Sequence, residues 1–255
     1  MEVRMNLIVT SEHRVGSRWL HYLLADLYGM DTSPEMDVKR IGEVNKIRSR
    51  FQHRKIVKFH HATHSDILES LEPWNYNIIS VVRNPMDRMV SLTFHNRYHK
   101  KKEVFKQSAF ETDQEAVKYT VLDDPFATQY NENQEKLMVQ GYSTRNKTLD
   151  TLPYIWTCYE WMHKDIVGEI RAITDWLGVE GIDDEFLNAV CLRHNFKTKT
   201  KGRGRGTEDR SDLWRRKGVL GDWRNWYDED MVEASRDIQS RYQNIIEQEI
   251  TNGNS

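Results

Sequence analysis

The sequence predicts an α/β domain with a central parallel β-sheet flanked by helices. Short apolar runs alternate with helical patterns along the chain, as they do when helices connect parallel strands. The run NIISVV at 77–82 is almost continuously apolar, which is typical of a parallel strand buried on both faces. Ligands of such sheets bind at the carboxyl ends of the strands, so the polar residues that follow each strand are the first candidates for function.

The N-terminal part of the chain predicts a strand, a loop and a helix. The strand is expected at 5–10, where MNLIVT is apolar and β-branched, and the polar residues SEHRVG follow it. The helix is expected because apolar residues recur at helical spacing from Trp19 to Leu27. A second helix is expected to start at Ser33, where proline follows a capping residue, and to continue to Phe51.

Three further strands are predicted, at 55–59, 77–82 and 154–159. The last two precede helical patterns that begin near Met86 and Ile166.

Two polar segments interrupt the alternation of strands and helices. Residues 99–153 are weakly periodic, and we interpret them as an insertion or lid with one or two helices. Residues 197–212 cannot pack a core and are expected to form a mobile loop. The chain is expected to end in an amphipathic helix from Asp228 to about Ile250. We therefore predict a single domain spanning 1–255.

Composition excludes several classes of protein. The 255 residues include 8 Trp, 11 Tyr and 8 Phe, which argues against a disordered chain. No run approaches the roughly 18 apolar residues of a membrane-spanning helix, and no signal-peptide cleavage site follows the N-terminus. The two cysteines, Cys158 and Cys191, exclude a disulfide framework. We expect a cytoplasmic protein with no membrane partner.

The charge distribution points to a compact anionic ligand. The net charge of −2 predicts no nucleic-acid partner. Residues 193–217, however, contain ten Lys or Arg and three Asp or Glu, a local net charge of +7. Such a local excess in an almost neutral chain favours one small anion over an extended polyanion.

The first candidate motif is RVGSRW at 14–19, between the first strand and helix. Glycine lets backbone N–H groups approach a phosphate, and a helix N-terminus adds partial positive charge. Ser17, Arg14 and Arg18 supply further donors. The Walker pattern GxxxxGK[ST] is absent, which weakens an ATPase interpretation. The alternative is an ordinary loop in which the serine caps the helix.

The second motif is VKFHHATH at 57–64. His60 ends a strand and can accept a proton near neutral pH, and Lys58 projects from the same face of the extended chain. The alternative is a structural or metal-binding histidine cluster. Because no cysteine is nearby and carboxylates occur only from Asp66 onward, we favour a general base and predict no metal.

The third and fourth motifs are SVVRNPMDRMVSLTFH at 80–95 and RRKGVLGDWRNW at 215–226. In the third, Arg83 and Ser91 could hold a second phosphate. Taken alone, that segment favours a helix-capping turn in which Arg83 pairs with Asp87. The fourth fits a loop around an anion, and its alternative is a solvated basic loop anchored by Trp223.

In their order and spacing the four motifs resemble the family of sulfotransferases that use 3′-phosphoadenosine-5′-phosphosulfate (PAPS). The resemblance extends from about Leu7 to Trp226 and implies a P-loop-kinase-like sulfotransferase fold. RVGSRW resembles the 5′-phosphosulfate loop that reads KSGTTW in cytosolic members, with Val15 where serine is usual. The resemblance implies that Arg14 binds the phosphosulfate and stabilises the leaving phosphate.

The other implied roles follow the same motifs. Residues assigned to the 5′-phosphosulfate cradle are Gly16, Ser17 and Arg18, with Trp19 at the adenine. Residues assigned to the 3′-phosphate are Arg83 and Ser91 of VVRNPMDRMVS, and Arg216, Lys217 and Gly218 of RKGVLGDW. CYEWM places Tyr159 on the nucleotide although Trp161 replaces the usual acid, and HNFK places Phe196 at the adenine. KFH implies His60 as catalytic base, assisted by Lys58. The basic segment 197–217 would then cover the nucleotide.

The expected activity is in-line transfer of a sulfuryl group from PAPS to an acceptor hydroxyl or amine, leaving 3′-phosphoadenosine-5′-phosphate (PAP), with His60 as general base and no metal. Two alternatives are a P-loop-type small-molecule kinase and a module that binds polyanions or nucleic acid through 197–217. The usual family stretch for dimerisation after GDW is replaced by RNWYDED, so the resemblance predicts no oligomeric state. The acceptor-binding site would be shaped by 99–153 and by aromatic residues such as Phe94 and Tyr98. The chemical class of the acceptor is not predicted.

Overall fold

The computed structural model describes residues 6–32, 36–37, 55–60, 76–98, 110–146, 154–212 and 215–253. The chain divides into two compact units. Unit 1 comprises Met1–Val82, Asn133–His194 and Ile245–Ser255, and unit 2 comprises Arg83–Glu132 and Asn195–Asn244. The motif at 14–19 therefore belongs to unit 1, and the motif at 215–226 belongs to unit 2.

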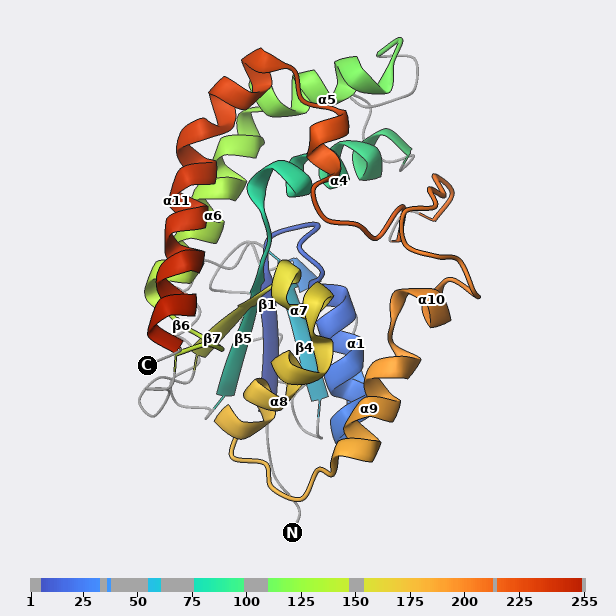
Figure 1. Cartoon of the computed structure of the whole chain (residues 1–255), viewed down its shortest axis with the longest axis vertical. Helices are drawn as coiled ribbons and strands as arrows, with labels where there is room; N and C mark the ends of the chain where they lie inside the picture. Colours follow the sequence, from blue (N-terminus) through green and yellow to red (C-terminus); the bar gives the residue numbers. More distant parts are fainter. Residues whose placement is uncertain are drawn as a thin grey trace. The chain divides into compact units, whose positions relative to one another are not determined.

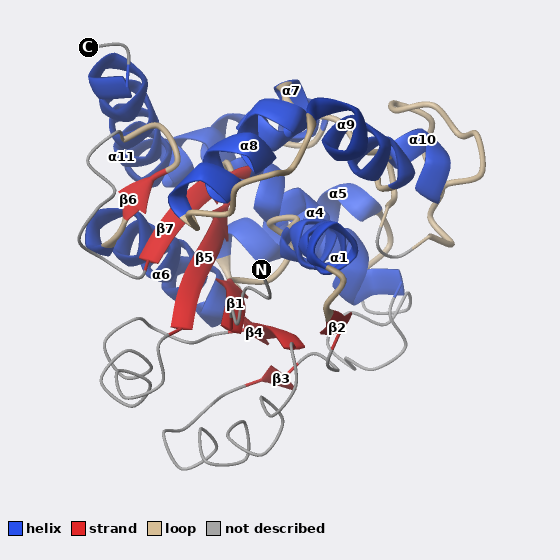
Figure 2. Ribbon diagram, turned by 90° about the horizontal axis from the view of Figure 1, so that it is seen from below, coloured by secondary structure: helices blue, strands red, loops and turns tan. Residues whose placement is uncertain are grey.

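Unit 1 contains a parallel β-sheet with the strand order β2-β4-β1-β5-β7-β6, and β3 pairs with β4 (Figures 1 and 2). The longer strands are β1 (Asn6–Ser11), β4 (Lys55–His60), β5 (Tyr76–Val82) and β7 (Tyr154–Cys158). The short strands are β2 (Asp31–Thr32), β3 (Met36–Asp37) and β6 (Tyr142–Ser143). All pairings among these strands are parallel, which confirms the predicted sheet.

The core of unit 1 lies between the sheet and three helices. These are α1 (Ser17–Tyr28), α8 (Ile166–Trp176) and α9 (Asp184–Arg193). Leu7 and Val9 of β1 belong to the same apolar cluster as side chains from all three helices. Ile8, which points to the opposite face of the sheet, is also fully buried. Burial on both faces explains why the strand is almost continuously apolar.

The sequence prediction is wrong at two strand boundaries. Met36 and Asp37 form β3 beside Phe59 and His60 of β4, where the start of a helix was expected. Pairing with a sheet edge requires extended backbone, which excludes the helical conformation at these residues. The remainder of that predicted helix, 38–54, lies outside the described residues. At the other boundary, Tyr159 is the first residue of α7 (Tyr159–Lys164) and not the last residue of a strand.

The segment 99–153, in which one or two helices were expected, contains α5 (Asp113–Leu122) and α6 (Pro125–Gln140). It also contributes β6, which was not predicted and which extends the sheet beside β7. The second half of α6 is fixed in unit 1 by β7, because the Tyr154 hydroxyl donates a hydrogen bond of 2.7 Å to the Leu137 carbonyl. This part of the segment therefore completes the sheet domain.

Unit 2 is mostly helical. It contains α4 (Pro85–Tyr98), α5, α10 (Phe196–Lys199), the 3-10 helix η6 (Asp222–Asn225) and most of α11 (Glu229–Gly253). Its core joins Val90 and Phe94 of α4 to Val117 of α5 and Met231 of α11. The predicted helices near 86–98 and 228–250 are thus confirmed. Within the described ranges, no helix has the length and apolar character required to cross a bilayer.

The segment 197–212 contains a helical turn, α10, that was not predicted. The Asn195 side chain caps it by accepting a hydrogen bond of 2.7 Å from the Thr198 amide. The Arg203 guanidinium donates to the carbonyl oxygens of Thr207 and Arg216, at 3.0 and 2.5 Å. These bonds hold the two sides of the loop together, and its mobility stays a prediction.

Candidate nucleotide-binding and catalytic site

The loop between β1 and α1 contains two residues with an unusual backbone conformation. Arg14 and Gly16 both have left-handed backbone conformations, with φ of 69° and 94°. Val15 between them is fully buried in the core of unit 1, which explains an apolar residue at this position. Gly16 is the N-cap of α1, and no side chain caps the helix. The alternative of a capping serine is therefore wrong, and Ser17 is the first helical residue.

Tyr159 packs directly against this loop. A Cβ atom added to Gly16 would lie 2.6 Å from Cδ2 of Tyr159, so the ring needs glycine at this position. Trp19 meets the same ring edge-to-face, with centroids 6.1 Å apart. The indole N–H of Trp19 is buried and has no hydrogen-bond partner within the described part of the chain. The structure thus brings together three residues that the sequence assigned to the nucleotide.

Lys58 and His60 lie at the carboxyl end of β4, beside the end of β1. In the register, Val9 is opposite Lys58 and Ser11 is opposite His60. Because alternate residues share a face of a sheet, both positions belong to the face that carries α1. Lys58 is buried. The backbone therefore places both predicted catalytic residues next to the strand that leads into Arg14.

In the described ranges, no three His, Cys, Asp or Glu side chains gather as a metal site would require, and the prediction of no metal stays a prediction. His61 and His64 lie outside the described residues.

In unit 2, Asp87 connects the third motif to the fourth. Its buried carboxylate accepts hydrogen bonds from the backbone N–H groups of Gly221 and Trp223, at 2.6 and 3.1 Å. The Asn84 side chain caps α4, because its Oδ1 accepts a hydrogen bond of 3.1 Å from the backbone N–H of Asp87. The capping turn expected from the sequence is present, but the Asp87 carboxylate is bound to the loop. Arg83 precedes this turn, and Ser91 lies in α4.

Asp222 holds the two cations of the fourth motif. The Lys217 ammonium donates a hydrogen bond of 2.6 Å to Oδ1 of Asp222, and the Arg216 guanidinium donates one to Oδ2. Burial raises the pKa of Asp222, but the hydrogen bonds from Lys217 and Arg216 outweigh it, so the pKa is lowered from its ordinary value. The sequence analysis gave Asp87 only the role of pairing with Arg83 and gave Asp222 no role, so both contacts with the fourth motif were missed. The only available signal was their carboxylates within two otherwise basic motifs.

Gly218 and Phe196 also come together in unit 2. A Cβ atom added to Gly218 would lie 2.5 Å from the Phe196 ring, and the φ of 66° at Gly218 favours glycine independently. The residues predicted for the 3′-phosphate and one edge of the adenine are thus neighbours. The predicted acceptor residue Phe94 is buried, and the Arg216 guanidinium lies 4.0 Å from its ring centroid. Phe94 therefore belongs to the core of unit 2.

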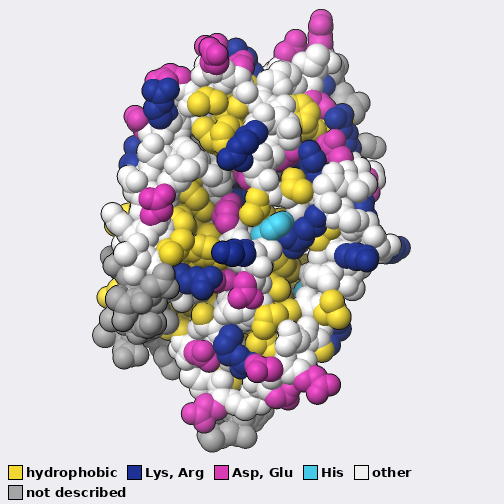
Figure 3. Space-filling model, viewed as in Figure 1, with side chains coloured by type: hydrophobic (Ala, Val, Ile, Leu, Met, Phe, Trp, Pro, Cys, Tyr) yellow, Lys and Arg dark blue, Asp and Glu magenta, His cyan; other side chains and the backbone are white. Residues whose placement is uncertain are grey.

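Much of the positive charge in 193–217 is balanced locally. Glu208 and Asp212 form ion pairs with Arg216 and Arg203, at 2.6 and 3.2 Å, in addition to the pairs of Asp222. On the face shown in Figure 3, Lys and Arg side chains are interspersed with acidic ones. An extended basic surface of the kind that nucleic acid requires is not seen on that face.

The sulfotransferase domain family matches residues 5–248 of the chain. The chain belongs to the sulfotransferase family. The predicted enzyme class, a sulfotransferase, is confirmed. A comparison with curated proteins found no match.

Solved sulfotransferase structures share the fold. Mouse sulfotransferase SULT7A1 complexed with PAP has a TM-score of 0.71 at 18% identity, covering 94% of this chain and 85% of that one. Retinol dehydratase in complex with androsterone and the inactive cofactor PAP has a TM-score of 0.61 at 15% identity, covering 95% and 81%. Retinol dehydratase with retinol and PAP has a TM-score of 0.61 at 17% identity, covering 92% and 80%. These similarities confirm the predicted α/β sulfotransferase fold.

Proposed function

We propose that this sulfotransferase transfers a sulfuryl group from PAPS to an acceptor hydroxyl or amine. The observation that carries the proposal is the loop at 14–19, where an uncapped helix N-terminus follows a left-handed Arg14 and a Gly16 that contacts Tyr159. Such a terminus provides N–H donors and partial positive charge for an anion. The PAP bound in the similar structures supports the choice of nucleotide.

The residues of the 14–19 loop fit the 5′ end of the nucleotide. Arg14 and Arg18 supply positive charge, Ser17 a hydroxyl donor, and Gly16 leaves the backbone accessible. The buried, unpartnered indole N–H of Trp19 and the Tyr159 ring provide an aromatic edge for the adenine.

The 3′-phosphate is assigned to a second group of residues. They are Arg83, Ser91, Arg216, Lys217 and Gly218, with Phe196 at the adenine. The ion pairs with Asp222 fix the Arg216 and Lys217 side chains before a ligand arrives, which lowers the entropy cost of binding.

Catalysis is assigned to three residues of unit 1. PAPS supplies an activated sulfuryl group, and transfer requires charge neutralisation and alignment more than covalent participation of the protein. We assign proton removal from the acceptor to His60 and stabilisation of the charged oxygens to Arg14 and Lys58. The burial of Lys58 strengthens its electrostatic effect. The proposed chemistry requires no metal.

We further propose that the protein is located in the cytoplasm and has no membrane or nucleic-acid partner.

Thermal unfolding with PAP, ATP and ADP tests the nucleotide assignment. A ligand that binds only the folded protein raises the midpoint in a concentration-dependent manner. We expect PAP to raise the midpoint much more than either of the other nucleotides. A magnesium-dependent shift with ATP and none with PAP would overturn the proposal in favour of a kinase.

A further inference from the structure

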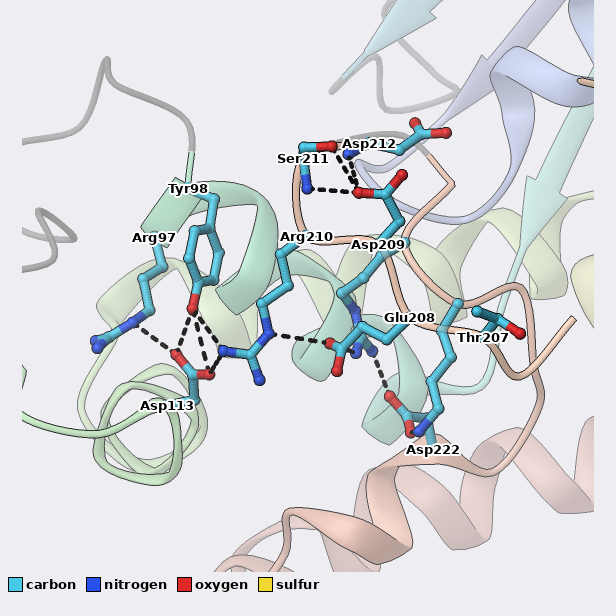
Figure 4. Close-up of polar contacts among 12 residues, drawn as sticks. Arg97, Tyr98, Asp113, Thr207, Glu208, Asp209, Arg210, Ser211, Asp212 and Asp222 are labelled. Carbon is cyan, nitrogen blue, oxygen red and sulfur yellow. Dashed lines mark hydrogen bonds and ion pairs between the residues drawn. The ribbon is translucent and has the colours of Figure 1, made fainter. Parts of the chain in front are cut away.

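A chain of alternating charges connects the fourth motif to α4 and α5 in unit 2 (Figure 4). Arg216 donates to both Asp222 and Glu208, the latter at 2.6 Å. The same Glu208 oxygen lies 3.5 Å from Nε of Arg210, whose guanidinium pairs with Asp113 at 2.7 Å. Arg216, which is assigned to the 3′-phosphate, is therefore already bound by two carboxylates.

The two carboxylates on Arg216 differ in burial and in number of partners. The Asp222 side chain is 4% exposed. It also accepts hydrogen bonds of 2.6 Å from the Lys217 ammonium and 3.1 Å from the Asn225 side-chain NH2 group. The Glu208 side chain is 29% exposed, and its ion pairs with Arg216 and Arg210 join it only to neighbouring parts of the same loop. Releasing Asp222 would leave a buried charge without its cations, whereas Glu208 can turn toward water.

We propose that Glu208 occupies the position on Arg216 that the 3′-phosphate takes, so that it is an intramolecular competitor of the nucleotide and lowers the affinity for 3′-phosphorylated ligands specifically. The inference rests on the proposed function. A phosphate and a carboxylate both accept from a guanidinium, and both cannot hold the same N–H. A phosphate and the Glu208 carboxylate at NH1 of Arg216 would repel each other, so we expect Glu208 to leave when a phosphate binds there, while Asp222 keeps NH2.

The remaining contacts explain why Arg216 would not move with Glu208. Its guanidinium lies 4.0 Å from the centroid of Phe94, and Asp222 holds its second nitrogen. Arg210 is held separately by Asp113 and by the Tyr98 hydroxyl, to which it donates at 3.0 Å. Displacement of Glu208 therefore breaks a partly exposed ion pair and leaves both arginines anchored, so the competition is modest.

Isothermal titration with PAP and with 5′-AMP, which lacks the 3′-phosphate, tests this inference in Glu208→Gln. The amide keeps the shape of the side chain and removes its charge. We expect PAP to bind about two- to fivefold more tightly than to wild type, and 5′-AMP to bind equally. Glu233→Gln is the matched control, because it removes an exposed carboxylate of α11 that pairs only with Arg236 among the described residues. It is expected to change neither affinity.

The sign of the change separates competition from structural support. If Glu208 merely positions Arg216, its replacement weakens PAP binding, and that result or an unchanged PAP affinity overturns the inference. An equal gain in affinity for PAP and 5′-AMP in Glu208→Gln also overturns the inference, because the 3′-phosphate would then play no part in the competition. If wild type itself binds PAP no better than 5′-AMP, the proposed function fails with it. These outcomes are distinguished within one set of titrations.

Discussion

Asp87→Asn tests whether the carboxylate at the start of α4 holds the fourth motif. In wild type, the buried Asp87 carboxylate accepts a hydrogen bond of 2.6 Å from the backbone N–H of Gly221 and one of 3.1 Å from that of Trp223. An asparagine retains one acceptor oxygen and turns an NH2 donor toward the second amide. The variant loses a charged hydrogen bond and leaves a buried donor unpaired, so we expect about 2–4 kcal/mol less free energy of unfolding.

Denaturant unfolding measures this loss, and PAP titration measures its effect on binding. Because Gly221 closely follows Arg216 and Lys217 in the chain, we expect the variant to bind PAP more weakly as well. Asp230→Asn is the matched control: its side chain is 77% exposed and pairs with Lys118 at 3.2 Å. Its replacement should change the free energy of unfolding by less than about 1 kcal/mol. An Asp87→Asn protein as stable as wild type would refute the role assigned to this carboxylate.

Three further results are expected. Gly16→Ala should weaken PAP binding and destabilise the fold by at least about 1 kcal/mol, because φ is 94° and the new Cβ would lie 2.6 Å from Tyr159; an unchanged unfolding midpoint would contradict this. His60→Ala should lower turnover about 10²–10⁴-fold with PAP affinity nearly unchanged, and full activity at neutral pH would remove His60 from the base role. Asp222 has a pKa below the ordinary 3.8, so its contribution to stability is present above about pH 4 and is lost as pH falls through the lowered pKa; unfolding measured from pH 5 downward should show a smaller loss in Asp222→Asn.

The sheet was predictable from sequence because its main strands are buried on both faces. Ile8 and Ile79 have no exposed surface, and this burial requires the apolar runs by which β1 and β5 were found. The two-residue strands β3 and β6 were missed because so short a pairing imposes no period on the sequence. The capping pattern at Ser33 predicted a helix that would include Met36 and Asp37, but these two residues pair with β4 instead.

The candidate site was predictable where a residue acts through its own charge or size. Arg14, Gly16 and Tyr159 stood in motifs, and the structure brings Gly16 and Tyr159 into contact. The contacts of Asp87 and Asp222 with the fourth motif were missed because they depend on how the loop folds. Asp87 lies 134 residues from Gly221 in the chain, and no local pattern marks an interaction of that kind.

We propose that Arg83 binds the 3′-phosphate of the same nucleotide whose 5′ end Arg14 binds. Calorimetric titration of Arg14→Ala and Arg83→Ala with PAP and 5′-AMP tests this assignment. Loss of one charged contact should cost about 1.5–3 kcal/mol of binding free energy. We expect this loss for both ligands in Arg14→Ala and for PAP alone in Arg83→Ala. Equal losses for PAP and 5′-AMP in Arg83→Ala, or unchanged PAP affinity in either variant, would contradict it.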